Sequence, residues 1–99
     1  MSEAIGLVEC RGLVATMVAV EAMCKAAAVR CARVDRVSGG ILIAVVIGDL
    51  ASVDAAVAAA VIAVRQYGQD ARTQIYPRPE PAAARLLVGS GRLEGGSAG

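Results

Sequence analysis

The stretch from Arg36 to Asp49 constrains the fold of this chain more than any other. It places a Ser38-Gly39-Gly40 turn directly before seven apolar residues, Ile41 to Ile47, and closes on Gly48-Asp49. A continuous apolar run of this length, rich in β-branched residues, favours a buried strand over a helix. We therefore expect a tight turn, a buried strand and then a helix, which the Asp49 side chain is well placed to cap.

The remaining elements group around this strand. Strands are expected over residues 4–9, 29–36, 41–47 and 71–76, and helices over 13–28, 50–66 and 81–87. The order strand, helix, strand, strand, helix, strand is that of the ferredoxin-like split βαβ arrangement. We predict an α+β domain over residues 1–87, with a four-stranded antiparallel sheet, two main helices on one face and a short C-terminal helix. The Gly- and Ser-rich residues 88–99 are expected to be a disordered tail.

The composition favours self-association. Apolar residues make up 57% of the chain, but only two residues are aromatic, so the core must consist mainly of Ala, Val, Ile and Leu. A chain this short and this apolar carries more apolar surface than one small core can hide. We expect an oligomer rather than a monomer.

Several function classes are disfavoured by what the chain lacks. A net charge of +1 with scattered basic residues argues against nucleic-acid binding. The chain has no histidine, which is the commonest general base and zinc ligand. Cys10, Cys24 and Cys31 form no CxxC pair and are expected to be reduced, small apolar residues. We therefore expect no catalytic residue, no metal site and no cofactor.

A membrane location must also be considered. Residues 41–64 are apolar enough and long enough to span a bilayer. However, Asp49 and Asp54 stand near the middle, and alanine does little to offset their insertion cost. Glu3 stands where a signal peptide would carry basic residues. We expect neither a membrane helix nor a signal peptide.

Four short motifs occur in an order that is typical of one protein family. Glu9-Cys10-Arg11-Gly12-Leu13 resembles the Glu-Thr-Arg-Gly-Leu that closes that family's first strand, and Glu21 to Ala27 resembles its first helix. Val46-Ile47-Gly48-Asp49 matches the end of a strand and the start of a helix, and Ile75 to Pro79 matches an Ile-Pro-Arg-Pro ending. Over residues 3 to about 87 the chain thus resembles a bacterial microcompartment (BMC-domain) shell protein of the single-domain, hexamer-forming type. The resemblance implies the BMC fold and a cyclic homohexamer that packs edge to edge into sheets enclosing enzymes.

The resemblance also implies roles for particular residues. Lys25 and Arg78 correspond to residues of the edge between hexamers, and Ala28 stands where family members often have Asn. The loop that surrounds the central pore corresponds to Arg36, Val37, Ser38, Gly39 and Gly40. The family often has Gly-Ser-Gly in this loop, whereas this chain has Ser38-Gly39-Gly40, so the serine hydroxyl is shifted by one position.

Each of these residues also has a simpler interpretation. Ser38-Gly39-Gly40 suits an ordinary hairpin turn. Lys25 can be a solvated helix residue paired with Glu21, four positions earlier. Arg36 can add positive potential near one mouth of a pore or pair with Asp35.

We predict a non-enzymatic structural protein of a bacterial microcompartment shell, a cytoplasmic polyhedral organelle. It would form hexameric tiles with a small central pore for small polar metabolites. Its partners would be itself, other shell proteins and encapsulated enzymes, but neither nucleic acid nor membrane. One alternative is a soluble ferredoxin-like regulatory or small-ligand-binding oligomer, which would need a ligand loop richer than this glycine turn. Another is a small acylphosphatase- or isomerase-like enzyme, which the absence of histidine makes a poor candidate.

Overall fold

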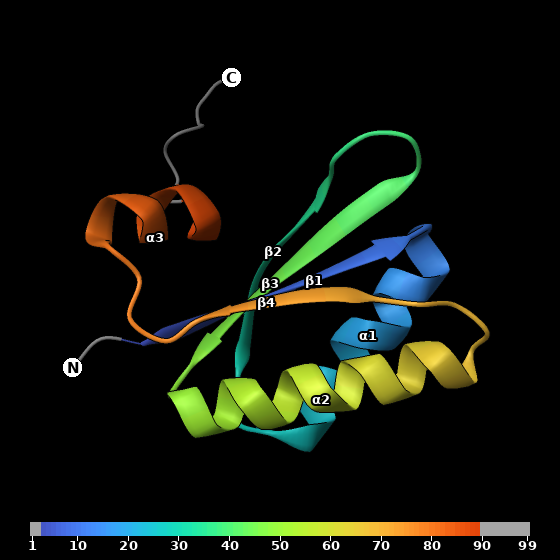
Figure 1. Ribbon diagram of the computed structural model, residues 1–99, viewed down its shortest axis with the longest axis horizontal. Coiled ribbons are helices and arrows are strands. Elements are labelled where there is room, and N and C mark those ends of the chain that lie inside the picture. The colour runs from blue at the N-terminus through green and yellow to red at the C-terminus, as the bar shows by residue number, and fades with distance from the viewer. Residues whose placement is uncertain (1–2, 90–99) are drawn as a thin grey trace.

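The structure, a computed structural model, describes residues 3–89 (Figure 1). Its elements, in chain order, are β1 (Ala4–Arg11), α1 (Leu13–Ala26), β2 (Arg30–Arg36), β3 (Ile41–Gly48), α2 (Leu50–Gln66), β4 (Arg72–Tyr76) and α3 (Pro81–Val88). Val88 belongs to α3, so this helix is one residue longer than predicted. Residues 90–99, most of the expected tail, lie outside the described residues.

The four strands form one antiparallel sheet in the order β2-β3-β1-β4. Because β3 lies between β1 and β2, the β1-α1-β2 unit is split, as the sequence predicts. Helices α1 and α2 cover the same face of the sheet (Figure 1). The predicted fold class is therefore confirmed.

Helix α1 ends two residues earlier than expected. Ala27 has extended backbone (φ −156°, ψ 165°), so the helix ends at Ala26 rather than at Ala28. Alanine itself favours a helix, but the chain must reverse here because Arg30 already pairs with Ile47 of β3. Sheet pairing therefore overrides the local helix propensity.

Both ends of α2 are closed as the sequence predicts. Asp49 Oδ1 accepts a hydrogen bond from the Ser52 N–H (2.8 Å), which is an N-cap contact. At the other end, Gly68 adopts a positive φ of 97° and its N–H donates to the Arg65 carbonyl (2.9 Å).

No helix within residues 3–89 is long and apolar enough to cross a membrane.

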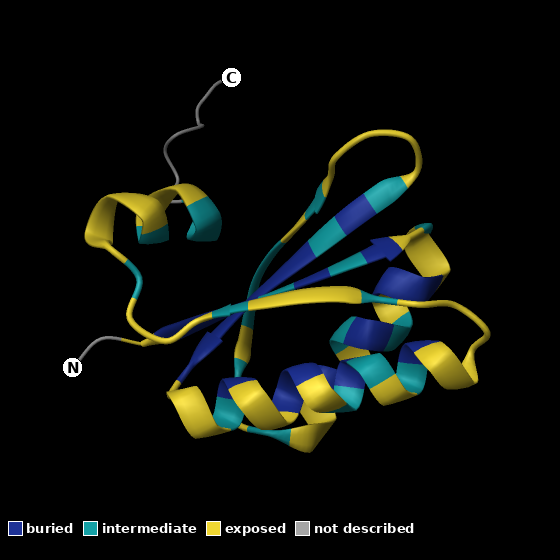
Figure 2. Cartoon of the chain, in the orientation of Figure 1, coloured by how far each residue is buried: buried dark blue, intermediate teal, exposed yellow. Residues whose placement is uncertain are grey.

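The main core lies between the sheet and the two long helices (Figure 2). It is built from small and medium apolar residues, which include Val8, Val46, Ala19, Met23, Val53, Val57 and Ala60. Gly6 lets α2 approach β1 closely, because a Cβ there would lie 2.9 Å from Val53 Cγ1 and 3.0 Å from Val57 Cγ2. Because the core of the described residues has no large aromatic side chains, the helices and the sheet can pack closely against each other.

A second, smaller cluster lies on the opposite face of the sheet. Ile5, Val45 and Ile47 are buried there, and residues of α3 pack against them: Ala84, Leu87 and Val88. Helix α3 therefore covers part of this second face of the sheet.

Strand β2 contains a β-bulge. Cys31 pairs with Val46 and Arg33 pairs with Val45, so Ala32 is an extra residue between them. Cys31 packs against the helix-side core, whereas Arg33 lines a hollow beside α3 on the other face. The bulge therefore places Arg33 on the α3 side of the sheet.

Candidate pore loop and edge residues

The loop between β2 and β3 projects beyond the end of β1 (Figure 1). All five residues from Arg36 to Gly40 are exposed. Gly39 and Gly40 have φ values of 60° and 81°, a left-handed conformation that favours glycine. The Val37 N–H donates to the Ile41 carbonyl (2.8 Å), and the Ile41 N–H donates to the Ser38 carbonyl (3.0 Å). The loop is thus a hairpin turn with a defined shape, as predicted.

Two residues that follow one another at the end of β1 anchor this loop. Arg11 Nη1 donates to the Gly39 carbonyl (2.8 Å), and the Gly12 N–H donates to the Gly40 carbonyl (2.7 Å). Within residues 3–89, the N–H groups of Ser38, Gly39 and Gly40 donate no hydrogen bond. The glycine carbonyls are therefore occupied, whereas the N–H groups remain available to a solute or to another chain.

The sequence contains Arg11-Gly12 in a recognised motif but does not reveal this contact. Arg11 and Gly39 are separated by 28 residues. Only the pairing of β1 with β3, which sets Arg11 opposite Ile41, brings the arginine beside the turn. No pattern in the sequence near Arg11 or near Gly39 indicates a contact between residues so far apart.

The ion pair that the sequence offered for Arg36, with Asp35, does not form. Asp35 pairs with Arg33 rather than with Arg36. Among the residues that the structure describes, Arg36 makes no salt bridge and is exposed. Arg11 is exposed as well. Two positive side chains thus stand beside the loop.

The three predicted edge residues come from separate segments. Lys25 lies in the last turn of α1, where its Nζ is 3.3 Å from Glu21 Oε2, so the predicted ion pair is confirmed. Ala28 lies between α1 and β2, and Arg78 lies between two prolines after β4. All three are exposed. No hydrogen bond or salt bridge in the described part of the chain joins Lys25 to Arg78, so a shared role requires a second chain.

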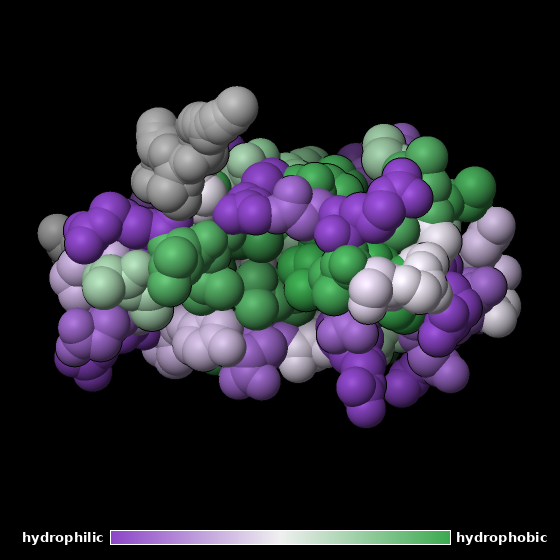
Figure 3. All heavy atoms as spheres, turned by 90° about the horizontal axis from the view of Figure 1, so that it is seen from above, coloured by the Kyte–Doolittle hydropathy of each residue, from purple (hydrophilic) through white to green (hydrophobic). Residues whose placement is uncertain are grey.

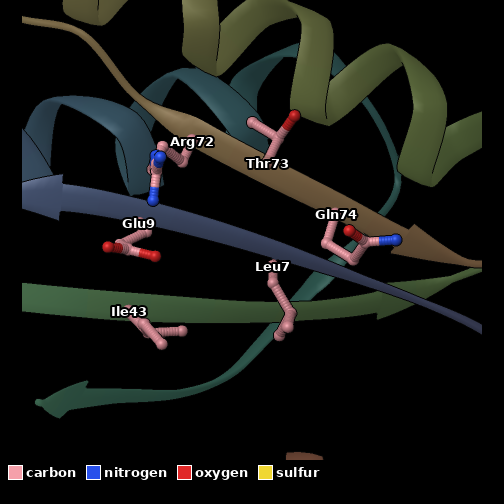
Figure 4. Close-up of a pocket in the computed structure, with 6 residues that line it drawn as sticks. All are labelled: Leu7, Glu9, Ile43, Arg72, Thr73 and Gln74. Atoms are coloured by element: carbon pink, nitrogen blue, oxygen red, sulfur yellow. The ribbon is translucent and has the colours of Figure 1, made fainter.

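A shallow hollow lies on the α3 side of the sheet (Figure 4). It has a volume of about 290 Å³ and is lined by Leu7, Glu9, Ile43, Arg72, Thr73 and Gln74.

Across residues 3–89, no group of three His, Cys, Asp or Glu side chains is placed to hold a metal ion. Burial raises the pKa of the Cys10 thiol and of the Cys31 thiol, which disfavours the reactive thiolate.

The fold and the sequence together define the class of protein. Residues 4–79 match the BMC domain, so the chain belongs to the BMC-domain family and is a microcompartment shell protein. This confirms the resemblance to a BMC-domain shell protein and favours the shell protein over the soluble regulatory alternative. The family is one of structural shell proteins.

Named relatives make the placement more specific. The chain is 42% identical over 77 residues to the bacterial microcompartment shell protein EutM of Salmonella typhimurium, which covers 78% of this chain and 80% of that protein. It is 34% identical over 85 residues to the shell protein PduA of Citrobacter freundii, which covers 86% and 91% of the two chains. It is also 36% identical over 81 residues to the carboxysome shell protein CcmK2 of Thermosynechococcus vestitus, with coverages of 80% and 79%.

A solved structure agrees with this placement. The crystal structure of a microcompartment protein from Desulfitobacterium hafniense superposes with a TM-score of 0.76 and 28% identity. The match covers 90% of this chain and 48% of that chain. This chain therefore spans about half the length of that neighbour.

Proposed function

We propose that this shell protein forms cyclic hexamers that tile edge to edge, and that residues 36–40 of six copies form the rim of a central pore. The observation that carries the proposal is the geometry of the loop. It is exposed, it projects beyond the sheet, and its glycine carbonyls are held by Arg11 and Gly12. A loop that is anchored in this way can keep one shape in every copy around an axis.

Exposed apolar residues support assembly. Leu13, Val14 and Met17 gather at the start of α1, with exposed fractions of 58%, 57% and 53%. Figure 3 looks onto the side where α3 and the hairpin tip lie in Figure 1, and it shows hydrophobic atoms in a band bordered by hydrophilic ones. Val37 and Leu86 are exposed apolar residues of those two segments. Each contact in a ring joins one patch of a subunit to a different patch of its neighbour, so every subunit buries two patches, which suits surfaces of this kind.

The groups at the rim favour anionic or strongly polar solutes. The N–H groups of Ser38, Gly39 and Gly40 lack acceptors within residues 3–89. Successive free N–H groups in a turn form a concave site for anions. Arg11 and Arg36 add positive potential beside it. We therefore expect the pore to pass small polar or anionic metabolites in preference to apolar ones.

Lys25, Ala28 and Arg78 would form the edge at which two hexamers meet. The aliphatic part of a lysine can lie along an apolar edge while its ammonium group reaches acceptors on the neighbour. Arg78 is stiffly placed, because Pro77 and Pro79 restrict the backbone on either side. Other shell proteins and the enclosed enzymes would be the remaining partners.

Light scattering and negative-stain electron microscopy test this proposal. The wild type should form particles of six times the 10.0 kDa chain mass, and hexagonal sheets at high concentration. Lys25→Ala or Lys25→Asp should keep the hexamers but abolish the sheets. Glu21→Ala is the matched control, because it removes the partner of Lys25 within the chain but leaves Lys25 itself.

The outcomes separate the possible errors. Sheets that persist in both Lys25 variants would show that the edge assignment is wrong. Loss of sheets in Glu21→Ala as well would mean that the ion pair within α1 matters rather than a contact between chains. Particles of 10.0 kDa, or trimers without hexagonal sheets, would contradict the hexamer itself.

A further inference from the structure

Helix α3 covers part of the apolar face of the sheet, but none of its residues is fully buried. Two hollows remain beside it. One has a volume of about 380 Å³ and is lined in part by Ile5, Ile47 and Pro81. The other has a volume of about 240 Å³ and is lined in part by Leu86 and Leu87. Apolar packing of α3 on the sheet is therefore incomplete, and something else must add to its attachment.

A polar contact from β2 reaches the last turn of α3. Arg33 Nη1 donates a hydrogen bond to the Leu86 carbonyl (3.0 Å), and the same guanidinium pairs with Asp35. Carbonyls in the last turn of a helix lack partners inside the helix, and the negative end of the helix dipole lies there. A cation is thus held at the point of the helix that attracts it most. The pair also has to span 53 residues of chain, so it joins two distant segments.

Gly89 gives the arginine room. Its φ of 71° is left-handed, and a Cβ at this position would lie 2.5 Å from Arg33 Nη1 and 3.0 Å from Arg33 Cδ. The same glycine closes α3, since its N–H donates to the Arg85 carbonyl (3.0 Å). One residue therefore ends the helix and makes space for the guanidinium against that end.

We propose that Arg33, oriented by Asp35 and seated against Gly89, is a latch that holds α3 as a lid over the apolar strip Ile5, Val45 and Ile47. Release of the latch lets α3 swing away from the sheet and exposes the strip. Arg33 acts as a positioning residue for the helix. This motion takes place within one chain and requires neither the ring nor the pore.

Hydrogen exchange measured by mass spectrometry on the full chain tests the latch. The side chains of Arg33 and Asp35 are 35% and 47% exposed, so the contact is partly screened by water. In Arg33→Gln, the hydrogen-bonded amides of α3, residues 84–88, should exchange about fivefold faster, the factor that corresponds to one net hydrogen bond of about 1 kcal/mol. Exchange in α1 and α2 should not change. Arg65→Gln is the matched control, because it removes an exposed arginine that is paired only loosely with Asp70 (4.0 Å).

Further variants keep the test decisive. Arg33→Lys keeps the charge but loses the planar guanidinium group. Amide exchange in α3 should therefore lie between the wild-type rate and the rate in Arg33→Gln. Gly89→Ala crowds Arg33 and also strains the left-handed end of α3, so it should loosen the helix; in combination with Arg33→Gln it should add less than the sum of the two single effects. Trypsin should cut after Arg85 faster in both Arg33→Gln and Gly89→Ala than in the wild type.

Three results would overturn the latch. The first is wild-type protection of the amides of residues 84–88 in Arg33→Gln, which would show that another contact holds the helix. The second is an equal rise in exchange across all elements, which would mean general destabilisation. The third is the same local rise in the Arg65→Gln control.

Discussion

Replacing Gly6 with alanine tests how closely α2 packs on the sheet. The added methyl carbon would lie 2.9 Å from Val53 Cγ1, 3.0 Å from Val57 Cγ2 and 3.2 Å from Val46 Cγ2. Carbon atoms pack best at about 3.5–4.0 Å, so the layers must separate by roughly half an ångström or more. Valine side chains are stiff at χ1, and all three are buried, so they cannot simply rotate away.

The expected loss of stability follows from two opposing effects. Overpacking of a well-packed core costs about 1–3 kcal/mol. Alanine also restricts the unfolded chain, which returns about 0.4–1 kcal/mol where the backbone conformation suits it. Gly6 lies in an extended strand without a positive φ, so this gain applies. We expect a net loss of about 1–2 kcal/mol and, for a domain of this size, a fall in Tm of roughly 5–10 °C.

Thermal unfolding at a fixed protein concentration measures this effect, because oligomerisation makes Tm depend on concentration. Val53→Ala is the matched partner variant, since it removes the methyl groups that the new carbon would strike. The double variant Gly6→Ala/Val53→Ala should lose at least about 1 kcal/mol less than the sum of the two single losses. A neutral or stabilising Gly6→Ala would refute the close approach. Strict additivity in the double variant would show that Val53 is not the obstacle.

Two further predictions concern the loop and the thiols. Gly39→Asn should leave the fold intact, since nothing lies within 4 Å of its Cβ position and Asn tolerates a left-handed backbone, and it should narrow the opening in a structure of the hexamer. An asparagine side chain far from the six-fold axis in that structure would contradict the pore assignment. Iodoacetamide near neutral pH should modify the exposed Cys24 before Cys10 and Cys31, whose pKa is raised by burial. Peptide mass spectrometry gives the order, and earlier modification of Cys10 would contradict it.

Elements with strong local signals could be predicted from the sequence. The helix Leu50–Gln66 has the expected bounds, because Asp49 caps its start and Gly68 follows its end. Gly39-Gly40 indicated the hairpin for a similarly local reason, since both residues need a positive φ. The family could be recognised because short motifs kept their order.

Features that depend on distant partners could not be predicted. Nothing in the run of alanines indicates that α1 stops at Ala26, since pairing of β2 with β3 decides it. The contacts of Arg11 with Gly39 and of Arg33 with Leu86 join segments 28 and 53 residues apart. The roles of Lys25 at an edge between hexamers and of the loop around a pore depend on further chains. They remain predictions.

The extra residue in β2 has a consequence for how this chain can change in length. The bulge at Ala32 interrupts the alternation of side chains between the two faces of the sheet. Cys31 therefore faces the helices, whereas Arg33, two positions later, faces α3. Deleting Ala32 would leave Cys31 opposite Val46 and Arg33 opposite Val45, because these two pairs already follow one another in the ladder. A regular strand that kept Ala32 in the ladder would instead set Arg33 opposite Ala44, on the helix side. The position of Arg33 beside α3 and the orientation of the loop therefore depend on Ala32 staying outside the ladder. Strand β2 can thus lose one residue between Cys31 and Arg33 without turning its other side chains to the opposite face.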